Sequence, residues 1–223
     1  SDHTSVSSIA QARRQIPHAS GIVSVPRYFG EGITVSRITR VELCSFAFDV
    51  PNLSLGGYAA VGIGNVIYKR GSSIKANRFA IRIICDDGVS GEYVTNWVST
   101  PSTLGQMRML APLLVGRDPE QRELIYDDLK RELRQYDHMG HGPIDIALWD
   151  LAGKKYGTSV SRLLGGFRER IPAYASTYHG QEEPGGLDSP EAFADYALAC
   201  KEHGFTGFKI HGWHSGEARR EAR

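Results

Sequence analysis

A Lys-x-His pair near the end of the chain is the part of the sequence best suited to acid–base chemistry. Lys209 and His211 lie two residues apart in the segment Gly207–Trp213. Alternate side chains of a β-strand project to the same face, so these two are expected to point together, away from the apolar residues that alternate with them. An imidazole beside a second cationic group can act as a general base near neutral pH. The spacing also fits a solvated lysine and a structural histidine on an edge strand, which is the alternative interpretation.

A strand–helix–strand unit positions this pair. The sequence predicts a strand over Ile171–Tyr178, a helix that Ser189 caps and Gly204 ends, and a second strand over Phe205–Trp213. A crossover through a helix implies that the two strands are parallel. In a parallel barrel, the side chains of the pair would face the interior near the C-terminal rim, where barrel enzymes have their active sites.

The preceding sequence predicts a small antiparallel sheet. A first strand ends at the turn-favouring residues 49–52, and an irregular strand follows over Tyr58–Tyr68. The clearest alternation of apolar and polar residues runs over Phe79–Cys85. Residues 86–88, Asp-Asp-Gly, are expected to turn the chain into a partner strand over Val89–Trp97.

Two helices are predicted after the sheet. Asp118 is the expected N-cap of the first, which includes Leu124 and runs through Tyr136. Pro143 opens the second, and Gly157 lies just past its end. The apolar stripe of this second helix consists of Ile144, Ala147, Leu148, Leu151 and Ala152.

The helix and the strands together resemble a known family. The run Gly142–Lys154, GPIDIALWDLAGK, followed by Leu163–Gly166, is similar to the helix that joins the capping domain to the barrel in the mandelate racemase and muconate lactonizing enzyme group of the enolase superfamily. The strands that begin at Ile171 and Gly207 resemble the first two barrel strands of that group, the second of which bears a Lys-x-Lys pair.

The resemblance implies a fold of two parts. The first is an α+β capping domain, with an antiparallel sheet and helices, and the second is the beginning of an α/β (TIM-like β/α) barrel. We expect residues 1–32 to form a flexible N-terminal arm and residues 33–157 to form the capping domain. Residues 158–223 are then the linker and the first βα units of an incomplete C-terminal barrel.

The resemblance also implies a shared chemical step. A base removes the proton α to a substrate carboxylate, and Mg²⁺ stabilises the resulting enediolate. The family places the base at the second residue of the strand pair and an electrostatic partner at the first. Here His211 stands where the pattern has lysine, and Lys209 is the tuning residue. His211 can therefore be the base, an acid, or a contact to a substrate hydroxyl.

Further substrate-binding residues follow from matching positions. Ser176 and Tyr178 lie at the rim end of the first barrel strand, where the family contacts the substrate carboxylate. Two capping-domain loops are expected to cover the site, and they contribute Tyr58 from the first and Asn96 and Trp97 from the second. The alternative for Trp97 is a packing residue at the end of a hairpin.

Magnesium is the expected cofactor, and its ligands are expected beyond residue 223. The family's metal ligands are acidic residues at the ends of the third, fourth and fifth barrel strands, so no metal ligand is assigned in this chain. Two His-x-x-His spacings, at His138/His141 and His211/His214, are compatible with zinc. Neither spacing has a third ligand nearby in the sequence, so no zinc site is predicted.

Composition narrows the range of partners. The formal net charge is +1 and no apolar run is long enough for a bilayer, so neither nucleic acid nor a membrane is expected as a partner. The start of the sequence lacks a signal-peptide pattern, and three cysteines far apart argue against a disulfide framework, so we expect a cytoplasmic location. The expected partners are a small hydroxy-carboxylate substrate and further copies of the chain in a homo-oligomer.

Three functions follow from these features. The first is a Mg²⁺-dependent acid-sugar dehydratase, and the second is a racemase or epimerase that shares its first step. The third, from another class, is a non-catalytic capping or interaction module. The 223 residues alone are expected to be inactive, because the family's metal ligands and other acid–base groups lie on later strands.

Overall fold

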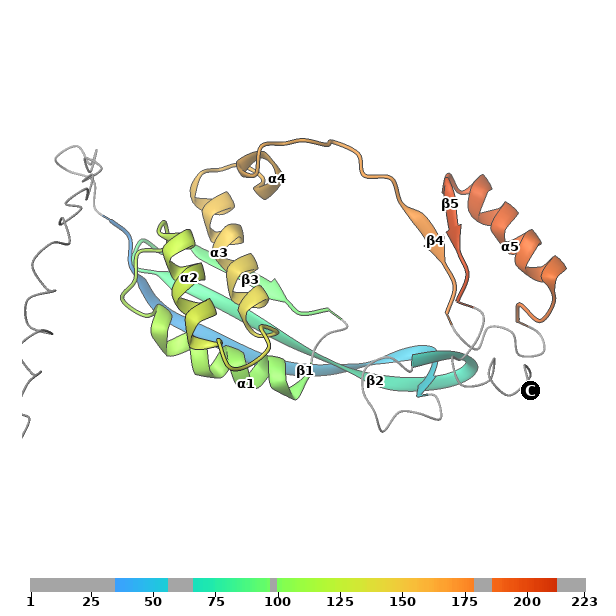
Figure 1. The fold of residues 1–223 in the computed structure, drawn as a ribbon, viewed down its shortest axis with the longest axis horizontal. Helices are drawn as coiled ribbons and strands as arrows, with labels where there is room; N and C mark the ends of the chain where they lie inside the picture. Colours follow the sequence, from blue (N-terminus) through green and yellow to red (C-terminus); the bar gives the residue numbers. More distant parts are fainter. Residues whose placement is uncertain (1–34, 56–65, 97–99, 179–185, 212–223) are drawn as a thin grey trace, which may run out of the picture. The chain divides into compact units, whose positions relative to one another are not determined.

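The structure is a computed structural model that describes residues 35–55, 66–96, 100–178 and 186–211. An antiparallel sheet with helices comes first in the chain, and a short parallel strand–helix–strand unit follows (Figure 1). This order is the α+β domain and barrel start that the sequence predicts.

The antiparallel sheet has its strands in the order β1–β2–β3. β1 is Ile38–Leu55, β2 is Val66–Cys85 and β3 is Ser90–Val94. The predicted turn between β2 and β3 is confirmed, because the amide of Gly88 donates to the carbonyl of Cys85 at 3.1 Å. Gly88 has a φ of 81°, which glycine adopts without a steric penalty.

β1 passes through residues 49–52, where the sequence predicts a turn, so that prediction is wrong. Among the described residues β1 pairs only with β2, and an edge strand tolerates Pro51 because the missing N–H is not needed by a second neighbour. The register shifts between Pro51 and Leu53, where Asn52 has a φ of 59°. The side chain of Asn52 accepts a hydrogen bond from the amide of Gly71 at 3.0 Å. A bulge thus absorbs residues that favour turns.

Two other predicted strands are described in part. Of the irregular strand, residues 58–65 lie outside the described residues, and residues 66–68 begin β2. β3 forms the centre of the strand predicted over residues 89–97, and residue 97 is also outside the described part.

Helices follow β3 in the chain. They are α1 (Pro101–Leu110), the 3₁₀ helix η2 (Ala111–Leu114), α2 (Arg122–Glu132), α3 (His141–Lys155) and α4 (Val160–Leu163). α1, η2 and α4 are not among the helices predicted from the sequence. α1 nevertheless has a clear start signal, because the Thr100 hydroxyl accepts from the Thr103 amide at 3.2 Å.

α2 begins later than predicted. Asp118 is not its N-cap, because the Asp118 carboxylate accepts from the Glu120 amide at 2.9 Å in a turn ahead of the helix. Gln121 is the N-cap. Leu124 is half exposed while Ile125 is fully buried, so the buried stripe of α2 begins at Ile125 and not at the predicted Leu124.

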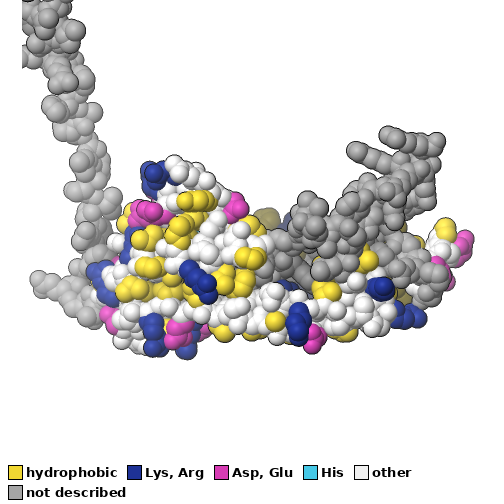
Figure 2. All heavy atoms as spheres, turned by 90° about the horizontal axis from the view of Figure 1, so that it is seen from below, with side chains coloured by type: hydrophobic (Ala, Val, Ile, Leu, Met, Phe, Trp, Pro, Cys, Tyr) yellow, Lys and Arg dark blue, Asp and Glu magenta, His cyan; other side chains and the backbone are white. Residues whose placement is uncertain are grey.

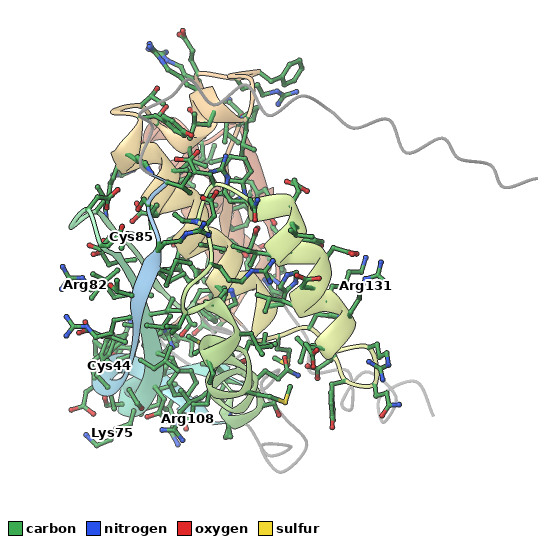
Figure 3. The ribbon with its side chains drawn as sticks, turned by 90° about the vertical axis from the view of Figure 1, so that its left-hand side faces the viewer. Cys44, Lys75, Arg82, Cys85, Arg108 and Arg131 are labelled. Atoms are coloured by element: carbon green, nitrogen blue, oxygen red, sulfur yellow. The ribbon has the colours of Figure 1, made fainter. Side chains whose placement is uncertain are left out.

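α1, α2 and α3 lie on one face of the sheet (Figures 1 and 3). Side chains from alternate positions of β2 and from the predicted stripe of α3 meet there, which confirms both periodic patterns. The buried cluster includes Phe79, Ile81, Ile83, Met107, Leu110, Ile125, Leu129, Leu133, Ile144, Ala147, Leu148 and Leu151. Arg82 projects from the opposite face of the sheet, away from the helices (Figure 3).

The predicted parallel strand–helix–strand unit is confirmed. It consists of β4 (Tyr174–Ser176), α5 (Pro190–Glu202) and β5 (Gly207–Lys209), and β4 pairs in parallel with β5. Both strands are shorter than the predicted spans of 171–178 and 205–213, because the ladder pairs three residues on each side.

The caps of α5 also agree with the sequence. The Ser189 hydroxyl accepts from the Ala192 amide at 3.1 Å, and Gly204 follows the helix with a φ of 93°. The ring of Tyr196 packs edge-on against Phe208, with centroids 5.9 Å apart. α5 therefore covers the face of β5 from which Phe208 projects.

The surface carries both signs of charge. On the face shown in Figure 2, basic and acidic side chains are interspersed, which matches the small net charge. Within the described residues, no helix combines the length and the apolarity needed to cross a membrane.

Candidate active site at the ends of two parallel strands

β4 and β5 present one polar face and one apolar face. Ala175 is paired with Phe208, and their side chains point to the α5 side. Ser176 is paired with Lys209, so these two share the opposite face. Both are exposed in the described part of the chain, and neither side chain is used to pack the helix.

The ammonium group of Lys209 lies beside an aromatic ring. Its Nζ is 5.9 Å from the ring centroid of Tyr174, which occupies the same face one pair further back along β4. At this distance the negative face of the ring attracts the cation. Tyr174 is not among the predicted site residues, although it stands two residues before Ser176 and therefore shares its face of the strand.

His211 is held just past the end of β5 by the segment that follows β4. Its ring Nδ1 is 2.8 Å from the carbonyl oxygen of Thr177 and 3.2 Å from the hydroxyl of Ser176. Its backbone amide donates to the hydroxyl oxygen of Thr177 at 2.8 Å. The structure therefore brings Ser176, Lys209 and His211 together at the C-terminal ends of the strands.

The Thr177 carbonyl favours the His211 tautomer that carries its proton on Nδ1. A carbonyl oxygen only accepts hydrogen bonds, so a contact of 2.8 Å requires Nδ1 to donate. An unprotonated Nδ1 would instead place two lone pairs against each other. In the neutral imidazole the remaining nitrogen, Nε2, is then the acceptor, which is the form that a general base needs.

The other predicted substrate-binding residues fall into two groups. Tyr178 follows Thr177 directly and is 39% exposed, and Asn96 is exposed at the end of β3. Tyr58 and Trp97 lie outside the described residues.

Acidic and imidazole groups do not gather into a metal site within residues 35–55, 66–96, 100–178 and 186–211. No three His, Cys, Asp or Glu side chains come close enough there to hold an ion. The rings of His138 and His141 have centroids 6.4 Å apart. His214, from the second His-x-x-His spacing, lies outside the described residues.

His141 has a different role, because it is buried at the start of α3. It is 5% exposed, its ring tilts against that of Tyr126 with centroids 4.3 Å apart, and its Nε2 has no hydrogen-bond partner among the described residues. Burial lowers the pKa of His141, and the neighbouring charges of His138 and Lys130 lower it further. The native state therefore favours a neutral ring.

This burial predicts a loss of stability in acid. The unfolded chain takes up a proton near pH 6.5, whereas the folded chain does so only at lower pH, so the free energy of unfolding should fall as pH drops below about 6.5. His141→Leu should weaken this dependence, and His203→Gln, at the exposed end of α5, should retain it. Urea unfolding at pH 7.5 and 5.0 compares the three proteins. If the free energy of unfolding falls by the same amount between pH 7.5 and pH 5.0 in wild type and His141→Leu, the prediction is contradicted.

The architecture and the site together define a class of protein. A sheet-and-helix domain followed by two parallel strands, with a basic pair at their C-terminal ends, is the arrangement found in the capping domain and barrel start of enolase-type proteins. The family of mandelate racemase / muconate lactonizing enzyme N-terminal domains matches residues 66–165. This match and the relatives described below support the resemblance of the chain to the mandelate racemase and muconate lactonizing enzyme group of the enolase superfamily.

Relatives of known activity carry out several related reactions. D-galactarolactone cycloisomerase from Agrobacterium fabrum is 39% identical over 136 residues, which are 58% of this chain and 35% of the relative. N-succinyl-L-Arg/Lys racemase from Bacillus cereus is 30% identical over 128 residues, 57% of this chain and 31% of the relative. The chain thus spans about a third of the length of these curated relatives.

A solved structure agrees with the same assignment. The crystal structure of D-glucarate dehydratase from Agrobacterium tumefaciens, complexed with magnesium, superposes with a TM-score of 0.65 and 26% identity. The match covers 82% of this chain and 46% of the dehydratase. The structural match therefore covers more of the chain than residues 66–165, which are the residues that the family model matches.

Proposed function

We propose that the full-length protein is an acid-sugar dehydratase. It removes the proton α to the substrate carboxylate, the enediolate expels the β-hydroxyl, which takes up a proton from a general acid and leaves as water, and the resulting enol becomes a 2-keto-3-deoxy acid. The observation that carries this proposal is the orientation of His211, whose Nδ1 donates to the Thr177 carbonyl so that Nε2 is the accepting nitrogen. The matching dehydratase structure supports the substrate class.

The residues of this chain have separate parts in the proposed step. Nε2 of His211 takes the α-proton. The ammonium group of Lys209, at the same end of β5, is the electrostatic partner in this step. The hydroxyls of Ser176 and Tyr178 bind the substrate carboxylate. Asn96, with Tyr58 and Trp97, contacts the hydroxylated end of the substrate from the capping domain.

Magnesium is proposed as the cofactor because the matching dehydratase contains it. The described residues of this chain do not fit a Mg²⁺ site, since they offer no group of three or more candidate ligands. We propose that the ligands come from sequence beyond residue 223.

A substrate panel tests the proposal. The full-length protein with Mg²⁺ is expected to convert one or more six-carbon acid sugars to 2-keto-3-deoxy acids, detected as semicarbazones. The panel includes acid-sugar lactones and N-succinyl amino acids, because two relatives act on these kinds of compound. Inversion at the α-carbon without loss of water would establish the second candidate, a racemase or epimerase. No turnover and no α-proton exchange with any compound would leave the non-catalytic interpretation.

A further inference from the structure

We propose that Thr177 is a positioning residue that fixes the tautomer and orientation of His211. This inference rests on the proposed function, in which His211 transfers the α-proton. Thr177 is 4% exposed and lies directly after β4, at the point where the polar faces of β4 and β5 end. It touches His211 with both its backbone and its side chain.

Three hydrogen bonds join Thr177 to the strand that carries the pair. Its amide donates to the carbonyl of Lys209 at 3.0 Å, which continues the parallel ladder past β4. Its hydroxyl oxygen accepts from the backbone amide of His211, and its carbonyl accepts from the ring of the same histidine, both at 2.8 Å. One buried residue thus contacts both members of the Lys-x-His pair.

The side chain and the carbonyl act on different parts of His211. The hydroxyl accepts from the His211 amide and so fixes the position of the His211 backbone from which the ring extends. The carbonyl then accepts the Nδ1 proton, which assigns the lone pair to Nε2. Without the hydroxyl, the His211 amide would lose its acceptor and the ring could move away from the carbonyl. Both tautomers of the imidazole would then be populated.

Ser176 supports this arrangement without replacing it. Its hydroxyl is 3.2 Å from Nδ1 and 3.4 Å from the Thr177 carbonyl. A hydroxyl can donate or accept, so Ser176 is compatible with either tautomer. The carbonyl of Thr177 is compatible only with a protonated Nδ1, which is why the assignment is made to Thr177.

Two substitutions in the full-length protein separate positioning from structural support. Thr177→Val keeps the shape of the side chain but removes the acceptor, and Thr177→Ser keeps the acceptor. We expect Thr177→Val to lower kcat by about 10- to 100-fold, the size of effect that follows when a partner that orients an active group is lost. KM should change little, because Thr177 is not assigned a contact with substrate. Thr177→Ser should restore kcat close to the wild-type value.

Nitrogen-15 NMR of the imidazole gives a readout that a purely structural role would not change. At alkaline pH, where imidazole is neutral, wild-type His211 should show a protonated Nδ1, and Thr177→Val should show a mixture of tautomers. A wild-type His211 protonated at Nε2 would overturn the inference even if Thr177→Val does not fold. A folded Thr177→Val protein with wild-type kcat and tautomer would also overturn it.

The same set of proteins distinguishes this inference from the proposed function. If His211→Asn keeps its turnover and its α-proton exchange, the proposed function fails. If His211→Asn is inactive while Thr177→Val behaves as wild type, His211 remains the acid–base group and only the role of Thr177 is wrong.

Discussion

Replacing His211 with asparagine is expected to lower the turnover number of the full-length protein by about 10² to 10⁴, the range for a positioned acid–base group. This corresponds to roughly 3 to 5.5 kcal/mol of activation free energy. Asparagine retains an amide N–H that can donate to the Thr177 carbonyl, as Nδ1 does at 2.8 Å. It has no group that can accept a proton near neutral pH. The loss of rate therefore measures proton transfer rather than a collapse of the strand end.

Exchange of the substrate α-proton in D₂O separates the possible roles of His211. If His211 is the base, exchange should fall together with kcat. If it contacts only a substrate hydroxyl, the Michaelis constant should change while turnover is largely kept. His203→Gln is the matched control, because His203 is an exposed histidine at the end of α5 whose ring contacts the Ala199 carbonyl at 2.8 Å. Wild-type exchange in His211→Asn would show that another group moves the proton.

The parts of the fold that the sequence predicts correctly are those with a strong periodic pattern. Strict alternation locates the second half of β2, and the five-residue apolar stripe locates α3, because each pattern reports a single buried face. Residues 49–52 mislead because a bulge on an edge strand accepts the same residue types as a turn. α1 escapes prediction because its buried stripe begins with the polar Thr103.

In the site, too, features that depend on a periodic pattern could be predicted from the sequence, whereas contacts to the backbone could not. Alternation predicts that Lys209 and His211 share one face of their strand, whereas the pairing of Lys209 with Ser176 depends on the register between the two strands, which the structure supplies. The contact of His211 with Thr177 could not be predicted, since its acceptor is a backbone carbonyl, which every residue possesses. Tyr174 could have been selected from its spacing, because every second residue of β4 shares the face of Ser176.

The close packing of β3 against α3 requires that residue 91 has no side chain, as in Gly91. A Cβ built there would lie 2.0 Å from the carbonyl oxygen of Ala147 and 2.6 Å from both the backbone nitrogen and the Cβ of Leu151. Backbone atoms of a helix cannot rotate away, so the helix would have to shift from the sheet. This shift of the helix would also strain the hydrogen bond that the Glu92 amide donates to the Asp150 carboxylate at 2.8 Å.

Gly91→Ala is therefore expected to lower the free energy of unfolding of the capping domain by about 3 kcal/mol or more, at the upper end of the usual effect of overpacking. Gly142→Ala is the matched control, because a Cβ at that position in the first turn of α3 meets nothing within 4 Å. It should be neutral or should stabilise the helix by up to about 1 kcal/mol, since alanine favours helix over glycine. Urea denaturation of both variants measures the difference. If Gly91→Ala unfolds at the same urea concentration as Gly142→Ala, β3 and α3 do not approach each other as closely as the structure places them.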